Sequence, residues 1–314
     1  MKNYILLVGN YGGTNLGDEM LKQASLQMLA SEKTEVKTMQ PCGGDFEVFA
    51  SGFRSMLNFR GQNWQAFLAI KNSSRVVFGG GGLINSDNWR SLVIWGQILA
   101  VALILGKQVD LVAQSFSSPP STGLRWLLSK CNSVSVRDKL SQEYLSQVGL
   151  NSKLVSDLAL DLDMDSIKNI FEDNKLLEGQ LLLSNDYGIC NAREYSKLSD
   201  SRCKSIVSML EQIEVPLVFV PFDKSDIDFY NKYMSNSQIP MAAASMQLFQ
   251  NAKFAIGMRL HFCLTAMKFG LDVLPLAYAS KVLGLFGDLG LQVVDLYTLH
   301  VQKNPLREWV NKKK

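Results

Sequence analysis

Histidine is scarce in this chain of 314 residues, which contains only His261 and His300. Five cysteines are scattered without a C-x-x-C pair, so we expect reduced thiols rather than a disulfide framework. Two distant histidines and dispersed acidic residues give no ligand spacing for a metal ion. The chain also lacks a Walker motif and a well-spaced dinucleotide fingerprint. We therefore expect no metal and no bound cofactor.

Strong charge and long apolar runs are missing as well. The formal net charge is +3, and no basic stripe is interleaved with aromatic residues, which argues against nucleic acid as a partner. The most apolar stretch, residues 92–105, is too short to span a bilayer and indicates a buried helix. The chain opens on a strand pattern without a signal-peptide layout, so a cytoplasmic location is expected. The lysine tail at residues 312–314 leaves open a peripheral attachment at the inner face of the membrane.

Apolar residues make up 47% of the sequence, enough for the cores of two domains of about 150 residues each. Strand-like runs alternate with longer helical patterns, which predicts α/β folding with mostly parallel sheets covered on both faces. We expect two Rossmann-like doubly wound domains that face each other across a cleft, at residues 1–165 and 175–314. A polar, acidic linker joins them, and the C-terminal tail is left open to pack back on the first domain. The expected strands cover residues 5–8, 76–78, 109–113, 133–136, 153–155, 180–184, 215–221 and 273–276, with another beginning at Phe254.

The loops after these strands meet at one edge of such a sheet, where α/β proteins bind their ligands. In the glycine run of residues 79–82, successive N–H groups could hold an anion, and close packing is an equal alternative. Asp18 and Glu19 open a helix, where they could orient a hydroxyl group or complement the helix dipole. Arg137 ends a strand, where it suits a phosphate or carboxylate, or else pairs with Asp138 at the surface.

The stretch from Phe254 to Leu285 is the strongest candidate site. An apolar run delivers Arg259 and His261 into the opening of a helix, and helix N-termini favour anions. His261 alone would more often be a structural histidine, but Arg259 and the strand-to-helix setting favour chemistry there. Lys281 lies at the end of the same stretch.

Five segments together resemble the polysaccharide pyruvyl transferase family. They are G-N-Y-G-G-T-N-L-G-D-E (9–19), V-V-F-G-G-G-G-L-I (76–84), S-V-R-D-K-L-S (135–141), G-M-R-L-H-F (257–262) and Y-A-S-K-V-L-G-L (278–285). The resemblance covers nearly the whole chain, and its most specific part is the Arg-Leu-His segment with the downstream lysine.

The resemblance implies a fold like that of GT-B glycosyltransferases and transfer of pyruvate from phosphoenolpyruvate to a sugar as a ketal. Phosphoenolpyruvate would be the donor substrate, and the acceptor would be a saccharide of a cell-surface polysaccharide or its lipid-linked precursor. His261 would be the acid, and Asp18 or Glu19 the base. The implied donor-binding residues are Arg137, Arg259, Leu260 and Lys281; the implied acceptor-binding residues are Asn10, Asn15, Gly80, Gly81 and Gln114. The acceptor sugar and the oligomeric state are not implied.

Three segments depart from the family pattern. Relatives read Gly-Gln-Gly-x-Gly-Pro after the third strand, where this chain has Ala113-Gln-Ser-Phe-Ser-Ser-Pro119. Their Asp-Pro-Ala is Asp157-Leu-Ala159 here, and residues 184–187 (Ser-Asn-Asp-Tyr) stand where relatives often have an arginine. Two other functions therefore stay open: a nucleotide-sugar glycosyltransferase of similar fold, and a non-catalytic saccharide- or anion-binding protein.

Overall fold

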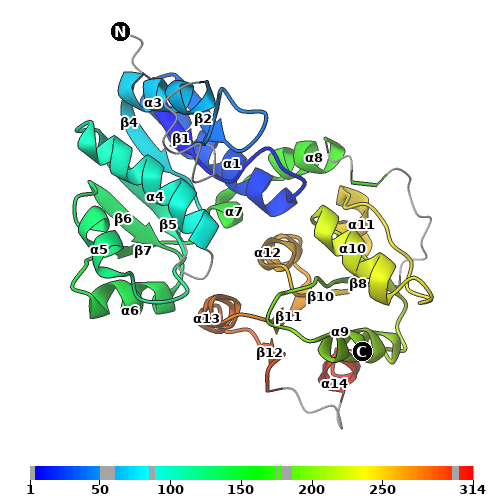
Figure 1. Ribbon diagram of the computed structural model, residues 1–314. Coiled ribbons are helices and arrows are strands. Elements are labelled where there is room, and N and C mark those ends of the chain that lie inside the picture. Colours follow the sequence, from blue (N-terminus) through cyan, green and yellow to red (C-terminus); the bar gives the residue numbers. More distant parts are fainter. Residues whose placement is uncertain are drawn as a thin grey trace. The chain divides into compact units, whose positions relative to one another are not determined.

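A computed structural model describes residues 4–49, 61–84, 89–173, 176–177, 186–298 and 304–313. Within this part, the chain forms two compact units. The first unit comprises Asp18–Leu162 and the residues before Thr14, and the second comprises Thr14–Gly17 and the residues from Asp163 onward. Each unit is built on a parallel β-sheet flanked by helices (Figure 1). The expectation of α/β folding on parallel sheets is confirmed.

The sheet of the first unit has seven strands in the order β3-β2-β1-β4-β5-β6-β7, and all neighbours pair in parallel. The chain runs outward from β1 to β3 and then crosses back to β4, so the strand order reverses between β1 and β4. The sequence did not predict β2 and β3. The strands are β1 (Tyr4–Val8), β2 (Val36–Gln40), β3 (Phe46–Glu47), β4 (Ser73–Phe78), β5 (Gln108–Gln114), β6 (Ser133–Val136) and β7 (Lys153–Leu154).

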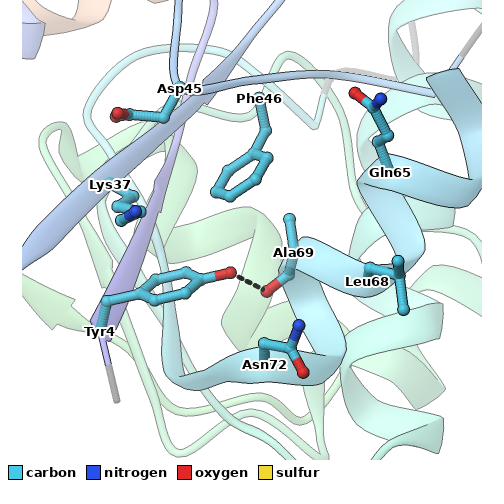
Figure 2. A pocket seen from close by; sticks show the side chains of 8 residues that line it. All are labelled: Tyr4, Lys37, Asp45, Phe46, Gln65, Leu68, Ala69 and Asn72. Carbon is cyan, nitrogen blue, oxygen red and sulfur yellow. Dashed lines mark hydrogen bonds between the residues drawn. The ribbon is translucent and has the colours of Figure 1, made fainter. Parts of the chain in front are cut away.

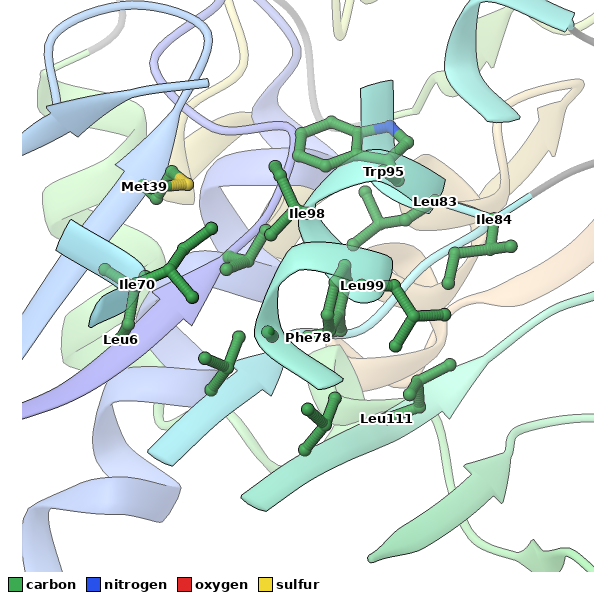
Figure 3. Packing of buried hydrophobic residues seen from close by; sticks show 14 of the residues in the cluster. Leu6, Met39, Ile70, Phe78, Leu83, Ile84, Trp95, Ile98, Leu99 and Leu111 are labelled. Atoms are coloured by element: carbon green, nitrogen blue, oxygen red, sulfur yellow. The ribbon is translucent and has the colours of Figure 1, made fainter. Parts of the chain in front are cut away.

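The helices of the first unit connect these strands. They are α1 (Leu16–Leu29), the 3-10 turn η1 (Ala30–Glu32), α3 (Gln62–Asn72), α4 (Trp89–Ile104), α5 (Thr122–Leu128), α6 (Lys139–Gln147) and α7 (Leu158–Asp161). The core forms where α3 and α4 pack on the sheet, through Leu6, Ile70, Phe78, Ile98 and Leu99 (Figure 3). The apolar stretch at residues 92–105 is therefore part of this core, through α4, as expected.

The sheet of the second unit has five strands in the order β12-β11-β10-β8-β9, again parallel. The order reverses between β8 and β10, which makes their carboxyl ends the ligand-binding position of this sheet. The strand expected at residues 180–184 lies outside the described residues, and the sequence did not predict β8. The strands are β8 (Gly188–Asn191), β9 (Leu217–Phe219), β10 (Phe254–Gly257), β11 (Asp272–Ala277) and β12 (Val294–Asp295).

The helices of the second unit are α8 (Met164–Glu172), α9 (Asp200–Glu211), α10 (Lys224–Tyr233), α11 (Met246–Asn251), α12 (Leu260–Lys268), α13 (Ser280–Asp288) and α14 (Pro305–Asn311). The C-terminal segment packs within this unit: Trp309 contacts Phe254 edge-to-face, and Lys313 bonds Asp272 at 2.8 Å. Among the helices described, none combines the length and apolar character needed to cross a bilayer.

Candidate functional site

The carboxyl edge of the second sheet gathers the candidate residues around the start of α12. Arg259 is the N-cap residue of α12, and Leu260 and His261 form its first turn. This helix follows β10 directly, so its N-terminus opens at the point where the strand order reverses. The first N–H groups of a helix have no intrahelical acceptor and favour an anion. The location expected for anion chemistry is therefore present in the second unit.

Phe262 fixes how α12 is turned. Its ring is fully buried and makes an edge contact with Phe222 and a tilted contact with Phe249, at centroid distances of 5.5 and 5.9 Å. A Cβ at Gly257 would lie 2.4 Å from this ring, so glycine is required there. Phe262 is thus anchored in the core, and the neighbouring His261, which is only partly buried, lies on a different side of the helix.

Arg259 is held by two carboxylates. Its Nε and Nη2 donate to both oxygens of Asp226 at 2.7–3.1 Å, and Nη2 also donates to Asp223 at 2.8 Å. Asp226 is buried and also accepts from the side chain of Asn191, which in turn accepts from the backbone N–H of Arg259. The sequence predicted Arg259 as a donor-binding residue; its main contacts are with the protein itself, and they fix the start of α12.

Segment Thr14–Gly17 packs against this corner of the second unit. Thr14 donates to Asp223 at 2.6 Å and accepts from the N–H of Lys224, while the N–H of Leu16 donates to the carbonyl of Phe222 at 2.8 Å. A Cβ at Gly17 would lie 2.2 Å from Nδ1 of His261, so the imidazole rests directly against the glycine backbone. The segment therefore fixes one side of His261.

The groups around Asp223 favour the ionised form of its carboxylate. Burial pushes the pKa of Asp223 upward, but the hydrogen bond from Thr14, the charge of Arg259 and the bond from Ser225 outweigh burial and lower the pKa.

Two cysteines nearby are unsuited to nucleophilic chemistry, because burial strongly raises the pKa of the Cys190 and Cys263 thiols.

Arg193 is a cation at this edge that the sequence analysis missed. It follows β8, and its guanidinium lies 5.8 Å from the ring centroid of Tyr278, the residue after β11. Tyr195 also contacts that ring, at 4.8 Å between centroids. The first strand of this domain was expected at residues 180–184, which lie outside the described residues, so no arginine was expected after it. Arg193 comes two residues after the end of β8 (Gly188–Asn191).

Lys281 lies in the first turn of α13, next to the carboxyl end of β11. Its side chain is outside what the structure describes. Because β8, β10 and β11 are neighbours, the residues after all three strands share one edge of the sheet. The second unit thus brings Arg193, Arg259, His261 and the backbone of Lys281 to one edge.

The acid and amide side chains predicted near the start of the chain form hydrogen bonds within their own loop and helix. Asn10 donates to Asp18 at 2.9 Å, and the N–H of Gly12 donates to Glu19 at 2.6 Å. Asn15, of the second unit, accepts from the N–H of Gly17 at 3.0 Å. These bonds shape the loop after β1 and the start of α1. The roles of these four side chains as base or acceptor-binding groups remain predictions.

The glycine run after β4 is explained by packing. A Cβ at Gly79 would lie 1.8 Å from the hydroxyl of Tyr11, and one at Gly80 would lie 2.8 Å from Leu21. The N–H groups of Gly79 and Gly81 donate to strand carbonyls, and Gln114 donates to the carbonyl of Gly79. These groups are therefore committed within the sheet. Contact of Gly80, Gly81 and Gln114 with an acceptor stays a prediction.

The loop that departs from the family pattern is anchored at its serine. Ser115 donates to Asp138 at 2.7 Å, and the N–H of Phe116 donates to Ser141 at 2.8 Å. Ala113, which precedes them, has a left-handed backbone with φ 46° at an irregularity in the β5–β6 pairing. Glycine adopts this conformation without strain, which is a physical reason for the glycine of relatives.

Arg137 lies in the first unit and forms a buried ion pair. Its Nη1 lies 2.5 Å from Oδ2 of Asp157, and the two side chains are 5% and 0% exposed. Asp157 also caps α7 by accepting from the N–H of Ala159. The surface pair with Asp138, considered from the sequence, is not what the structure contains. The proposed contact of Arg137 with the donor is untested.

A cavity of about 540 Å³ lies at the opposite edge of the first sheet, where β1 begins (Figure 2). Tyr4, Phe46 and Leu68 line it together with the acid Asp45, and Lys37, a cation of its lining, lies 3.4 Å from Glu35. This cavity does not suit a ligand with two anionic groups. No cluster of three or more metal-ligating side chains occurs among the residues described.

Solved structures define the class of fold. The chain is similar to S. aureus MnaA with UDP (TM-score 0.61, 10% identity, covering 99% of this chain and 88% of that one). It is also similar to Methanocaldococcus jannaschii UDP-GlcNAc 2-epimerase with UDP-GlcNAc and UDP (TM-score 0.58, 12% identity, covering 100% of this chain and 92% of that one). A third similar structure is Acinetobacter baumannii MurG (TM-score 0.52, 11% identity, covering 99% of this chain and 90% of that one). The fold is GT-B-like, which confirms the expected class.

A family model described as polysaccharide pyruvyl transferase matches residues 15–280, most of the chain. The protein therefore belongs to the polysaccharide pyruvyl transferase family, as the motifs predicted. The match includes Arg137, Arg193 and the Arg259–His261 segment. No curated protein sequence is significantly similar to the chain.

Proposed function

We propose that the protein transfers pyruvate from phosphoenolpyruvate to two hydroxyl groups of one sugar, forming a ketal and releasing phosphate. The observation that carries the proposal is the position of His261 in the first turn of α12, at the strand-order reversal of the second sheet and against Gly17. Family membership supports the same reaction class.

The donor carries two anionic groups, and the edge offers matching partners. The N-termini of α12 and α13 present N–H groups and a partial positive charge. Arg193 and Lys281 supply full charges after β8 and β11. Arg259 bonds its carboxylates through Nε and Nη2, while Nη1 bonds no residue that the structure describes. We assign Nη1 to binding phosphoenolpyruvate, whereas the N–H groups at Nε and Nη2 hold the start of α12 in place.

The chemistry needs one proton on the donor and two hydroxyl groups of the acceptor. His261 protonates C3 of phosphoenolpyruvate, which becomes a methyl group and leaves C2 electrophilic. A sugar hydroxyl bonds C2 and gives its proton to a base, for which Asp18 or Glu19 is the candidate. The bond from C2 to the phosphate oxygen then breaks, and phosphate leaves with the proton that the base has taken up. A second hydroxyl of the same sugar bonds C2 and closes the ketal, and its proton returns to His261.

Phosphate release from phosphoenolpyruvate in the presence of saccharide acceptors tests the proposal. His261→Gln should lower kcat by about 10²–10⁴-fold, while His300→Gln, the matched control, should not. Arg193→Gln should raise the KM for phosphoenolpyruvate about tenfold or more, because it removes a charge-assisted contact. An unchanged rate in His261→Gln would remove the acid assignment.

The rival functions give different ligand preferences. The GT-B-like fold and solved neighbours that hold UDP favour, as second candidate, a nucleotide-sugar glycosyltransferase. Thermal-shift measurements with phosphoenolpyruvate, UDP-sugars and inorganic phosphate separate the two, since ligand binding raises Tm. A shift with UDP-sugar and none with phosphoenolpyruvate supports the rival. Binding of phosphoenolpyruvate without turnover on any acceptor supports the non-catalytic alternative.

A further inference from the structure

The part of the amino edge of the first sheet that is formed by β4 to β7 concentrates positive charge. The four segments that lead into β4, β5, β6 and β7 (residues 71–72, 105–107, 129–132 and 149–153) contain four lysines and no acidic residue. Arg125, near the end of α5, adds a fifth cation. This set, called the basic edge, consists of Lys71, Lys107, Arg125, Lys130 and Lys153. For a chain with a net charge of only +3, this is a marked concentration.

The members of the basic edge lie along one line because the strands are parallel neighbours. Arg75 of β4 lies opposite Gln108, Asp110 of β5 opposite Ser133, and Ser135 of β6 opposite Lys153, so each strand begins beside the third residue of the strand before it. Lys107 also donates to the carbonyls of Lys71 and Ser73 at 2.6–2.7 Å. Two acids lie nearby, the buried Asp110 and the partly exposed Glu32, and both are already paired with Arg75.

Two large apolar side chains stand exposed at this same edge. Ile104, the last residue of α4, is 81% exposed, and Trp126, in the last turn of α5, is 60% exposed; among the described residues these are the most exposed large hydrophobics. Helices α4 and α5 contact each other and lie side by side (Figure 1). Leu154 of β7 is exposed as well. Exposed apolar side chains and lysines therefore share this end of the sheet.

We propose that the basic edge, with Trp126 and Ile104, docks the protein on an anionic lipid bilayer. Tryptophan favours the region of the lipid headgroups, and lysine is attracted to the negative surface potential of anionic lipids. The sign of the charge selects the bilayer over a second copy of this chain, because two copies meeting at this edge would bring five cations against five. Docking goes beyond the proposed transfer reaction and does not depend on it.

This surface is distinct from the lysine tail considered from the sequence. Lys313 of that tail bonds Asp272 in the second unit. The lysines at helix ends also complement helix dipoles. Complementing a helix dipole requires no lipid, so a measurement of lipid binding distinguishes this local role from docking on a bilayer.

Co-sedimentation with phosphatidylcholine vesicles, with and without phosphatidylglycerol, tests the proposal on the full chain. We expect binding only with phosphatidylglycerol, weakening as salt is raised. Lys71→Gln with Lys130→Gln should weaken binding about 25-fold, at about fivefold for each lysine. Trp126→Ser with Ile104→Ser should weaken it about tenfold or more. All four side chains are exposed or at a surface turn, and urea unfolding verifies that the variants fold.

Matched controls lie elsewhere on the protein. Lys204→Gln with Lys253→Gln removes two exposed charges of the second unit, and Trp64→Ser removes a tryptophan, 46% exposed, from the first half of α3. These controls should bind vesicles as the unchanged chain does. Equal loss in controls and test variants would overturn the proposal, as would absence of binding to phosphatidylglycerol vesicles. A shift from oligomer to monomer in the Trp126→Ser/Ile104→Ser variant, without lipid binding by the unchanged chain, would assign the surface to self-association instead.

Discussion

Gly17 and His261 lie in contact, although they are 244 positions apart in the sequence. A Cβ at position 17 would lie 2.2 Å from Nδ1 of the imidazole and 2.8 Å from its Cβ. Such distances are too short for a side chain, so position 17 and the orientation of His261 are coupled. Thr14, bonded to Asp223, holds the same segment in place.

Gly17→Ala should therefore displace His261. We expect kcat for phosphate release to fall about a hundredfold, because a misplacement of about 1 Å at a catalytic group has this effect. Binding of phosphoenolpyruvate should change little. Gly13→Ala is the matched control, since no atom lies within 4 Å of a Cβ at that position.

With only two histidines, the imidazole NMR signals provide a second readout for Gly17→Ala. In His300→Gln only one imidazole signal is left, and it belongs to His261. That signal should shift in Gly17→Ala and stay in place in Gly13→Ala. Unchanged signal and unchanged kcat in Gly17→Ala would contradict the coupling.

Removing the partner of a buried charge should destabilise the second unit strongly. Arg259→Met leaves Asp226 buried without its ion pair, which costs about 3–5 kcal/mol of unfolding free energy. Arg307→Met breaks an exposed pair with Glu214 and should cost about 1 kcal/mol or less. Urea unfolding measures both. Similar losses in the two variants would mean that the Arg259 pair contributes no more than a surface pair.

The role of Arg137 can be separated into stability and binding. Because its ion pair with Asp157 is buried, Arg137→Met should lower the unfolding free energy by about 3–5 kcal/mol. If Arg137 also holds the donor, the folded fraction of the variant shows a raised KM for phosphoenolpyruvate. Asp157→Asn keeps the arginine and the amide oxygen that can cap α7 but removes the charge of the pair, so it should lose stability without that change in KM.

The contribution of Asp223 to the free energy of unfolding should decrease as the solution is acidified. Its pKa is lowered in the folded state, so its stabilisation is complete above the ordinary value of 3.8 and is lost as pH falls through the lower, folded value. Asp223→Asn should be less stable than the unchanged chain by a constant amount between about pH 5 and 7. The difference should shrink below that range. A difference that grows on acidification would contradict the assignment.

Ala113→Gly should stabilise the first unit. A non-glycine residue in the left-handed region is strained by about 1–2 kcal/mol, and glycine returns about 0.5–1 kcal/mol of that as extra freedom of the unfolded chain. The net gain should be roughly 0.5–1 kcal/mol in urea unfolding. Lys33→Gly, at φ 52°, should behave alike, whereas Ala102→Gly within α4 should destabilise.

Local patterns were enough to predict much of the fold. The alternation of strand and helix periods gave parallel α/β folding, because each period depends only on neighbouring residues. They also placed His261 and Arg259 between a strand and a helix. Three strands, β2, β3 and β8, were not predicted, and without β8 the position of Arg193 after a strand went unnoticed.

Residue types at fixed short spacings were enough to identify the family and the candidate site motif. Which partners those residues meet depends on the tertiary structure. Asp223 and Asp226 reach Arg259 because the start of α10, which follows β9, and the end of β10 fold to the same edge, and Gly17 reaches His261 from the start of the chain. The basic edge likewise exists only because four separated segments begin neighbouring parallel strands. Contacts between distant residues follow from strand pairing and core packing, which short-range sequence patterns do not encode.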